Sequence, residues 1–408
     1  MKKRIAAIGF AVCLLVVTFL AGCGGNTNSN AAPADNSAAP ADNSAAGDNA
    51  TAVTAGGNGP YQFGVNTWGA GVPMLDSFGD GAEFSSHALG NTTIRASDDF
   101  TADKEIANVQ NFASSGVDGM VLSAAAVTTL PQIAQTCSDA KIPFVLQTFI
   151  GDDKDIATLA DSNEYYVGAV DSDMVYDGQV IGQKALDDGM KTAVIIGGNI
   201  GDNNMDQRTQ GFKDVFEKGG GKVLFEARCT DPSETATKAE DMLAANKDVD
   251  CLYALVGDYV PGSLSAMDKL GLTGKINVYM SCVDEASAKL IKDGTIKLGN
   301  DGITLASYIA PTLLQNYLDG NRILDNSGKA PRFRTIPFLV TQDNVDAYMS
   351  VFCSPDTKPF TEEMLNKLIV AQNPDVTYQT YVDLIQSGLK LDAILVAHGL
   401  PATGTSAS

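Results

Sequence analysis

The chain has 408 residues, with 28 Lys and Arg against 49 Asp and Glu and a formal net charge of −21. Hydrophobic residues make up 44% and charged residues 19%, which is typical of a soluble globular protein. A surface this acidic repels phosphate groups, so neither nucleic acid nor an anionic membrane surface is expected as a partner.

The N-terminal residues indicate export. Lys2-Lys3-Arg4 precedes an apolar run over 5–20 that is of signal-peptide rather than membrane-spanning length. The residues that follow, Leu20-Ala21-Gly22-Cys23, resemble the lipobox of bacterial lipoproteins, in which the chain is cut before the cysteine and its thiol is acylated. The resemblance implies a signal peptide at 1–22, lipidation of Cys23 and a lipid-anchored protein on the extracytoplasmic face of the cell membrane. An uncleaved membrane anchor, or an ordinary signal with an incidental cysteine, is the alternative.

Residues 23–59 are predicted to form a disordered tether. Asn, Ser, Ala, Pro, Asp and Gly dominate this stretch, and the heptapeptide Pro33-Ala34-Asp35-Asn36-Ser37-Ala38-Ala39 is repeated directly after itself. Such a composition buries too little apolar surface to fold. The function should therefore reside after Pro60.

The cysteines beyond Cys23 give no metal motif. Cys137, Cys229, Cys251, Cys282 and Cys353 form an odd set without a CxxC spacing, so we expect neither a zinc site nor a cofactor. Buried free thiols are the favoured state. A single disulfide between Cys229 and Cys251 is the alternative, because both flank predicted neighbouring strands.

The remaining residues, about 350, alternate short apolar runs with amphipathic segments that often end at glycine, as at Ser115-Gly116. Alternating β and α units predict parallel sheets with helices on both faces, here two doubly wound, flavodoxin-like lobes of five strands each. The predicted strands are Tyr61–Asn66, Thr92–Ala96, Met120–Ser123, Phe144–Thr148, Tyr165–Val170, Thr192–Ile196, Lys222–Ala227, Cys251–Leu255, Val278–Ser281 and Ile296–Gly299.

Several segments, in this order, resemble the type 1 periplasmic binding proteins of the ribose-binding type. They include Gly116-Val117-Asp118-Gly119-Met120 before the third strand, Val170-Asp171-Ser172-Asp173 after the fifth, and Arg208-Thr209-Gln210-Gly211-Phe212 after the sixth. The resemblance covers roughly residues 61–342. It implies two lobes joined by a hinge of three crossings, near Asp171, Asn300 and Ile336.

The lobes implied are 61–170 with 301–335 and 171–300 with 336–345. In this family the lobes close on a small polar ligand, and lipid-anchored members deliver it to the permease of an ABC importer. The resemblance therefore implies a monomeric sugar-binding transport protein. The alternatives are a lipoprotein that presents a sugar, nucleoside or autoinducer to a sensor kinase or chemoreceptor, and an adhesive surface lipoprotein with a degenerate cleft.

Ligands of such sheets bind beyond the carboxyl ends of the strands, which selects the candidate site residues. Trp68, the only tryptophan, and Phe100 offer aromatic faces for a sugar ring or planar base, although Trp68 suits core or hinge packing as well. Paired donors and acceptors for hydroxyl groups are expected from Asn66, Asp98, Asp99, Gln147, Arg208, Asp258, Asp284, Asn300 and Asp301, each of which also suits a helix cap or solvated loop.

Three ligand-facing positions at strand ends depart from the ribose-type pattern. Gln147-Thr148 stands where an Asp-Arg pair is usual, Val256-Gly257-Asp258 replaces an Asn-Asp, and Cys282 occupies the place of a ligand aspartate. Ribose itself is therefore disfavoured as the ligand.

Residues 346–408 form a further departure, since the family chain normally ends soon after Gln342. Helices are predicted over Glu362–Ala371 and Tyr378–Ser387, as an extension that packs across a lobe or the hinge or only adds stability. An enzyme is not expected, because the only histidines, His87 and His398, have no metal-like spacing and no Gly-x-Ser-x-Gly occurs.

Overall fold

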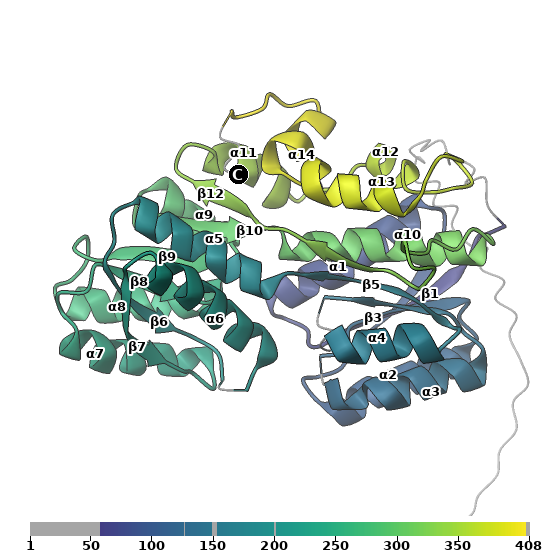
Figure 1. The fold of residues 1–408 in the computed structure, drawn as a ribbon, viewed down its shortest axis with the longest axis horizontal. Helices are drawn as coiled ribbons and strands as arrows, with labels where there is room; N and C mark the ends of the chain where they lie inside the picture. Colours follow the sequence, from purple (N-terminus) through teal and green to yellow (C-terminus); the bar gives the residue numbers. More distant parts are fainter. Residues whose placement is uncertain (1–57, 126, 149–152, 200, 405–408) are drawn as a thin grey trace, which may run out of the picture. The chain divides into compact units, whose positions relative to one another are not determined.

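The computed structural model describes residues 58–125, 127–148, 153–199 and 201–404. The predicted signal peptide, Cys23 and all of the predicted tether except residues 58 and 59 lie outside these ranges. The described chain forms two α/β lobes, each built on a six-stranded sheet, and a helical C-terminal extension (Figure 1).

The first sheet is entirely parallel, in the order β11-β5-β4-β3-β1-β2. Helices α1 and α10 cover one face and α2, α3 and α4 the other, so the central strands β3 and β4 are fully buried and read as continuous apolar runs. The elements of this lobe up to the first crossing are β1 (Gln62–Thr67), α1 (Pro73–Ala88), β2 (Thr92–Ser97), α2 (Ala102–Ser115), β3 (Gly119–Leu122), η1 (Val127–Thr129), α3 (Leu130–Ala140), β4 (Phe144–Gln147), α4 (Asp153–Ser162) and β5 (Tyr166–Ser172).

The second sheet has the order β12-β10-β9-β8-β6-β7, with only β12 antiparallel to its neighbour. Helices α5 and α6 cover one face, and α7, α8 and α9 cover the other. The elements are α5 (Met174–Asp187), β6 (Thr192–Ile196), α6 (Asn203–Lys218), β7 (Lys222–Ala227), η2 (Pro232–Glu234), α7 (Thr235–Ala245), β8 (Cys251–Ala254), η3 (Gly257–Tyr259), α8 (Val260–Lys269), β9 (Asn277–Ser281), α9 (Glu285–Lys292) and β10 (Leu298–Asp301).

The ten predicted strands are all present, most of them with ends shifted by only a residue or two. Two further strands were not predicted: β11 (Arg332–Thr335) joins the first sheet and β12 (Phe338–Thr341) the second. Both are four-residue edge strands in which only alternate side chains are buried, so they lack the continuous apolar run that marks the central strands.

Three passages link the elements of the two sheets, as expected. The first passage follows β5. The second follows β10 and leads back to the first lobe through η4 (Ile303–Leu305) and α10 (Ala306–Leu318). The third lies between β11 and β12. The hydroxyls of Ser172 and Thr335 lie 2.7 Å apart and join two of these passages.

The C-terminal extension explains why α10 is buried on all sides. Every residue from Ala306 to Asn316 is buried, because the first sheet lies on one side of α10 and the extension on the other (Figure 1). The helices predicted at Glu362–Ala371 and Tyr378–Ser387 are present in shorter form. The extension contains α11 (Val345–Phe352), α12 (Glu362–Asn366), α13 (Tyr378–Asp383), the π-helical turn η5 (Leu384–Gly388) and α14 (Leu391–Ala397).

All five described cysteines are free thiols, as favoured from the sequence, and four of them are buried. The alternative disulfide between Cys229 and Cys251 is therefore not formed.

Candidate ligand-binding site

Backbone strain marks the carboxyl ends of several strands. Asp99 and Phe100 after β2, Thr148 after β4 and Cys282 after β9 all have φ between 48° and 64°, a left-handed conformation that non-glycine residues rarely adopt. Such strain persists only where the surrounding fold imposes it, and it is concentrated at functional sites. Four of the five non-glycine residues with positive φ in the described ranges thus follow strands, and the fifth, Lys141, ends α3.

In the first lobe, Asn66 and Asp98 form one buried network. The Asn66 amide donates to Asp98 Oδ2 (2.7 Å) and to the Ser123 carbonyl (3.0 Å), and Asn66 Oδ1 accepts from the Ser123 N–H (2.7 Å). Asn108 on α2 donates to Asp98 Oδ1 (2.8 Å). Burial raises the pKa of Asp98 to about 7. The network ties the ends of β1, β2 and β3 together and leaves neither side chain exposed.

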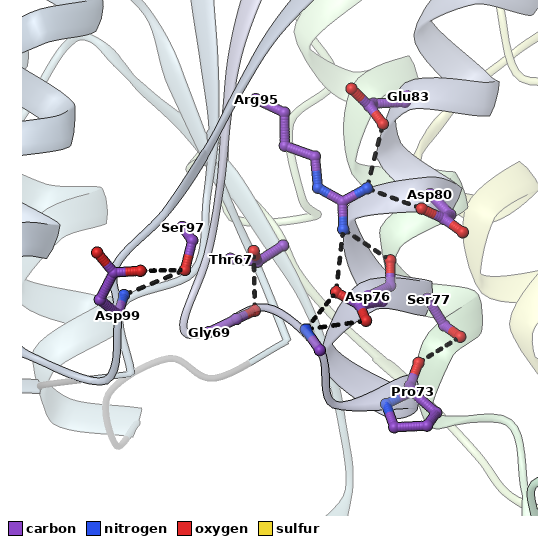
Figure 2. Close-up of polar contacts among 11 residues, drawn as sticks. Thr67, Gly69, Pro73, Asp76, Ser77, Asp80, Glu83, Arg95, Ser97 and Asp99 are labelled. Carbon is purple, nitrogen blue, oxygen red and sulfur yellow. Dashed lines mark hydrogen bonds and ion pairs between the residues drawn. The ribbon is translucent and has the colours of Figure 1, made fainter.

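The two predicted aromatic side chains lie together at the edge of this network. The ring of Trp68 meets that of Phe100 edge to face, with centroids 6.4 Å apart, and Phe100 is 51% exposed. A Cβ on Gly69 would lie 2.1 Å from the Phe100 ring, so only glycine permits this packing. Asp99 accepts from the Ser97 hydroxyl at 2.9 Å, and Figure 2 shows this pair beside the loop between β1 and α1.

Gln147, at the end of β4, differs from its neighbours in having no partner. Its side chain is fully buried, yet neither Oε1 nor Nε2 makes a hydrogen bond within the described structure. An unpaired buried amide costs roughly 1–3 kcal/mol for each unsatisfied group. The side chain therefore has unmet hydrogen-bonding capacity at the strand end where the ribose-type pattern is broken.

Arg208 lies at the centre of the second lobe. Glycine makes this possible: a Cβ on Gly178 or Gly211 would lie 1.9 Å from a carbonyl oxygen of the opposite helix, so α5 and α6 can approach closely only without one. The guanidinium is 1% exposed, and its Nε donates to Asp177 Oδ1 at 2.7 Å. Its Nη1 donates to the Leu255 carbonyl (3.0 Å) and its Nη2 to the sulfur of Cys282 (3.4 Å).

Asn300 belongs to the same buried group of side chains, which we call the Arg208 centre and which comprises Arg208, Asp177, Ser281 and Asn300. Its amide donates to the Asp177 carbonyl at 3.1 Å, while its Oδ1, fully buried, has no partner within the described residues. Asp177 also accepts from the Ser281 hydroxyl at 2.6 Å. Asp177 was not selected from the sequence, because it lies inside α5 rather than at a strand end.

A cavity of about 520 Å³ lies where the strand ends of the second lobe face the first turns of α1. Three predicted residues, Asp258, Asp284 and Asp301, line it, whereas the other eight do not. The remaining lining residues are Pro73, Met74, Ser77, Asp80, Val256, Gly257, Cys282, Val283, Glu285, Ile303, Thr304, Tyr308, Tyr348, Phe352, Cys353, Ser354, Pro355, Thr357, Lys358 and Pro359.

The cavity is acidic, but most of its carboxylates already have partners. Asp80 pairs with Arg95 at 2.7 Å (Figure 2), and Glu285 pairs with Lys289 at 2.7 Å. Asp284 caps α9 by accepting from the Ser287 N–H at 2.7 Å.

Asp301 accepts from the Tyr348 hydroxyl at 2.8 Å, and its burial raises the pKa of its carboxyl to about 7. Asp258 has no bonded partner among the described residues, and burial followed by repulsion from Asp284 raises its pKa. One cation, Lys358, lines the cavity together with these five carboxylates. An anionic ligand is therefore disfavoured, whereas hydroxyl groups can donate to the carboxylate oxygens.

Sequence reasoning missed the contributions of α1, α10 and the extension to this cavity. Asp80 and Tyr308 lie inside helices, and Phe352–Pro359 belongs to a segment that the ribose-type pattern lacks. None of these residues directly follows a predicted strand, so the rule that ligands bind beyond the strand ends does not select them.

Two α/β lobes with a polar cavity between them define a class of two-lobed solute-binding proteins. Residues 63–322 match the family described as the periplasmic binding protein domain. The chain belongs to this family, as the sequence resemblance implied. It is a family of extracytoplasmic binding proteins rather than of enzymes.

Solved structures of similar fold share less than a quarter of their residues with this chain. A galactofuranose-binding protein is 19% identical with a TM-score of 0.62, over 71% of this chain and 98% of that one. An ABC transporter solute-binding protein from Bacillus halodurans with bound myo-inositol is 19% identical with a TM-score of 0.60, over 72% and 98%. One from Actinobacillus succinogenes with bound D-allose is 17% identical with a TM-score of 0.63, over 71% and 100%.

No curated protein sequence matches the chain. Within the described ranges, no helix is both long and apolar enough to cross a membrane. The same ranges hold no group of three or more His, Cys, Asp or Glu side chains placed to bind a metal ion.

Proposed function

We propose that this protein is a lipid-anchored solute-binding protein that captures a sugar between its two lobes and delivers it to the permease of an ABC importer. The observation that carries the proposal is the polar cavity at the strand ends, lined by both lobes and rich in hydrogen-bond acceptors. The structures of similar fold support the choice of ligand class, since their bound or named ligands are sugars or a cyclic polyol.

Closure of the lobes supplies the mechanism. The proposed lobes are residues 61–170 with 301–335 and residues 171–300 with 336–345, joined by the three passages. A ligand that contacts both lobes is bound more tightly when they are closed, so binding shifts the hinge equilibrium. The permease then distinguishes the loaded from the empty protein by its shape.

The predicted site residues take two proposed roles. Asp258, Asp284 and Asp301 line the cavity and accept hydrogen bonds from ligand hydroxyls. Trp68 and Phe100, with Gln147, form the first-lobe edge that approaches the ligand on closure. Asn66, Asp98, Asp99, Arg208 and Asn300 hold the strand ends in place through the hydrogen bonds described above.

Lipid anchoring at Cys23 is part of the proposal and has its own test. The wild-type protein should incorporate a palmitate analogue supplied to growing cells and sediment with membranes. Cys23→Ala should abolish both, while Cys353→Ala, a cysteine in the folded part, should change neither. Membrane association of an unlabelled Cys23→Ala protein would contradict the anchor.

Ligand binding is tested by thermal melting of residues 58–408 with D-allose, D-galactose, L-arabinose, ribose and myo-inositol. A sugar at about 100 times its Kd adds about 2.7 kcal/mol of stability, which raises Tm measurably. We expect stabilisation by at least one sugar and none by glucuronate, which carries a negative charge. The absence of any shift would contradict sugar binding and favour the adhesive alternative.

Transport is tested separately by uptake of the stabilising sugar in cells with and without the gene. Loss of uptake supports delivery to an importer. Undiminished uptake, together with loss of a transcriptional or chemotactic response to that sugar, would overturn the transport role in favour of the sensory alternative.

A further inference from the structure

The C-terminal extension makes a fourth passage between the lobes. Its first helix, α11, is fixed to the second lobe, because the Tyr348 hydroxyl lies within hydrogen-bond distance of both Asp301 Oδ2 and the Val283 carbonyl, at 2.8 Å from each. The chain then runs through Phe352–Pro359 to the first lobe, where α12 and α13 lie along α10 (Figure 1). We name Phe352–Pro359 the crossing segment.

The far end of the crossing segment is fixed as firmly as its start. The Asn316 amide on α10 donates to the Leu368 carbonyl at 2.8 Å and accepts from the Val370 N–H at 2.8 Å. The Phe360 ring stacks on Tyr308 of α10, with centroids 5.1 Å apart. The crossing segment is thus held between two packed ends, one on each lobe.

The crossing segment is itself ordered by local hydrogen bonds and forms one wall of the cavity. The Thr357 hydroxyl lies within hydrogen-bond distance of the carbonyls of Ser350 (3.2 Å) and Val351 (3.0 Å) and donates to one of them, which fixes the turn after α11. All of its residues except Asp356 line the cavity. A ligand in the cavity therefore meets the extension as well as the two lobes.

Three polar groups that line the cavity have no bonded partner within the described structure, and each comes from a different part of the chain. Tyr308 of α10 is 4% exposed, and its hydroxyl makes no hydrogen bond. Asp258 of the second lobe and Lys358 of the crossing segment make neither an ion pair nor a hydrogen bond. They supply a hydroxyl, an acceptor and a cationic donor.

We infer that the extension is a ligand-binding element: Lys358 and Tyr308 contact the hydroxyl groups of a neutral polyhydroxylated ligand whose other hydroxyls bind Asp258. This inference rests on the proposed function and adds two specificity-determining residues to it. Sugar hydroxyls both donate and accept, so one ligand satisfies all three groups. The acidic lining keeps anionic sugars out despite Lys358.

The ligand then ties the extension to both lobes. A bound sugar replaces water at three groups that have no protein partner. Because these groups make no hydrogen bond to the protein, the sugar can bind them without breaking a hydrogen bond within the protein. The segment is also covalently linked to both lobes, so it helps to orient the cavity when the hinge moves.

The test measures by titration calorimetry the Kd of the compound that gives the largest Tm shift among D-allose, D-galactose, L-arabinose, ribose and myo-inositol. Lys358→Ala and Tyr308→Phe should each raise Kd about tenfold or more, since each removes one hydrogen bond from the bound state. Lys358→Arg, which keeps the charge, should bind within about threefold of wild type.

Two matched controls separate contact from packing. Lys367→Ala alters an exposed lysine of the same extension that pairs with Glu363 outside the cavity, and Tyr378→Phe removes a hydroxyl from a ring stacked on Phe333. Both should leave Kd unchanged. Melting of each variant without sugar confirms that it folds.

The outcomes distinguish the inference from the proposed function. If a sugar binds the wild type and Lys358→Ala and Tyr308→Phe bind it equally well, the extension is not a ligand-binding element and sugar binding stands. If no sugar binds the wild type, the proposed function fails, and the inference fails with it.

Discussion

The Arg208 centre and the cavity next to it differ in how their polar side chains are paired: Asn300 Oδ1 is the one group of the centre described above that lacks a partner within the described residues. Around Arg208, each guanidinium nitrogen and the Asp177 carboxylate have protein partners. In the cavity, Tyr308, Asp258 and Lys358 have none within the described structure. Both regions lie at strand ends, so position alone does not distinguish scaffold from site. Groups with partners hold the fold together, whereas groups without them are available to a ligand.

The largest effect is expected from breaking the Arg208 centre. Arg208→Ala leaves the Asp177 carboxylate buried without its cation, and removing one partner of a buried ion pair costs about 3–5 kcal/mol. Urea unfolding monitored by circular dichroism measures the loss. Lys269→Ala, which removes an exposed ion pair with Glu240, should have only a small effect. Equal losses in the two variants would contradict a structural role for Arg208.

A second pair of variants compares amides with and without partners. Asn66→Leu removes the donor to Asp98 Oδ2 and the acceptor of the Ser123 N–H, so it should lower the free energy of unfolding by at least about 2 kcal/mol. Gln147→Leu removes an amide that has no partner, so the ligand-free protein should change by less than about 1 kcal/mol or become more stable. A large loss on Gln147→Leu would show that its amide is satisfied in solution.

The pH dependence of stability provides a third comparison. Burial raises the pKa of Asp301 to about 7 from the ordinary value of 3.8. Between these values the unfolded chain is ionised while the folded one keeps its proton, so stability falls as the pH rises from about 4 to about 7. Asp301→Asn should make this fall smaller, as measured by urea unfolding at pH 4.5, 6 and 7.5. An identical pH profile in the variant would rule out a contribution from Asp301.

The smallest effect is expected at the aromatic edge. Phe100→Ala removes a half-exposed ring, so stability should change by less than about 1 kcal/mol. The same change exposes Trp68, the only tryptophan, and should move its fluorescence emission to longer wavelength. Phe225→Ala, which removes a ring of similar exposure on β7, should leave the emission unchanged. A red shift in both variants would mean that the emission does not report on Phe100.

Much of the fold could be predicted because central parallel strands are buried on both faces. Phe144–Gln147 and Cys251–Ala254 are continuous apolar or small runs that local sequence reveals. β11 and β12 escaped prediction because edge strands need only alternate buried side chains, and Arg332-Phe333-Arg334-Thr335 has no distinctive pattern without its neighbour β5.

The candidate site could be predicted only to the level of strand ends. Of the residues that the topology rule selected, Asp258, Asp284 and Asp301 line the cavity. The rule gave no means of separating them from Asn66 or Arg208, whose partners lie 31 or more residues away in the sequence. Lys358 was not selected, because the expectation that residues 346–408 pack across a lobe or the hinge does not say which of their side chains face the cavity.

The sequence by itself determined the family and the two-lobed α/β architecture, because these depend on local hydrophobic runs and on a fixed order of segments. Only the tertiary structure decided which polar groups are satisfied within the protein and which remain free. Hydrogen-bond partners are set by contacts such as Arg208 with Asp177 and Tyr348 with Asp301, which local sequence does not encode. The extension's place in the cavity wall was decided in the same way, by its packing on α10.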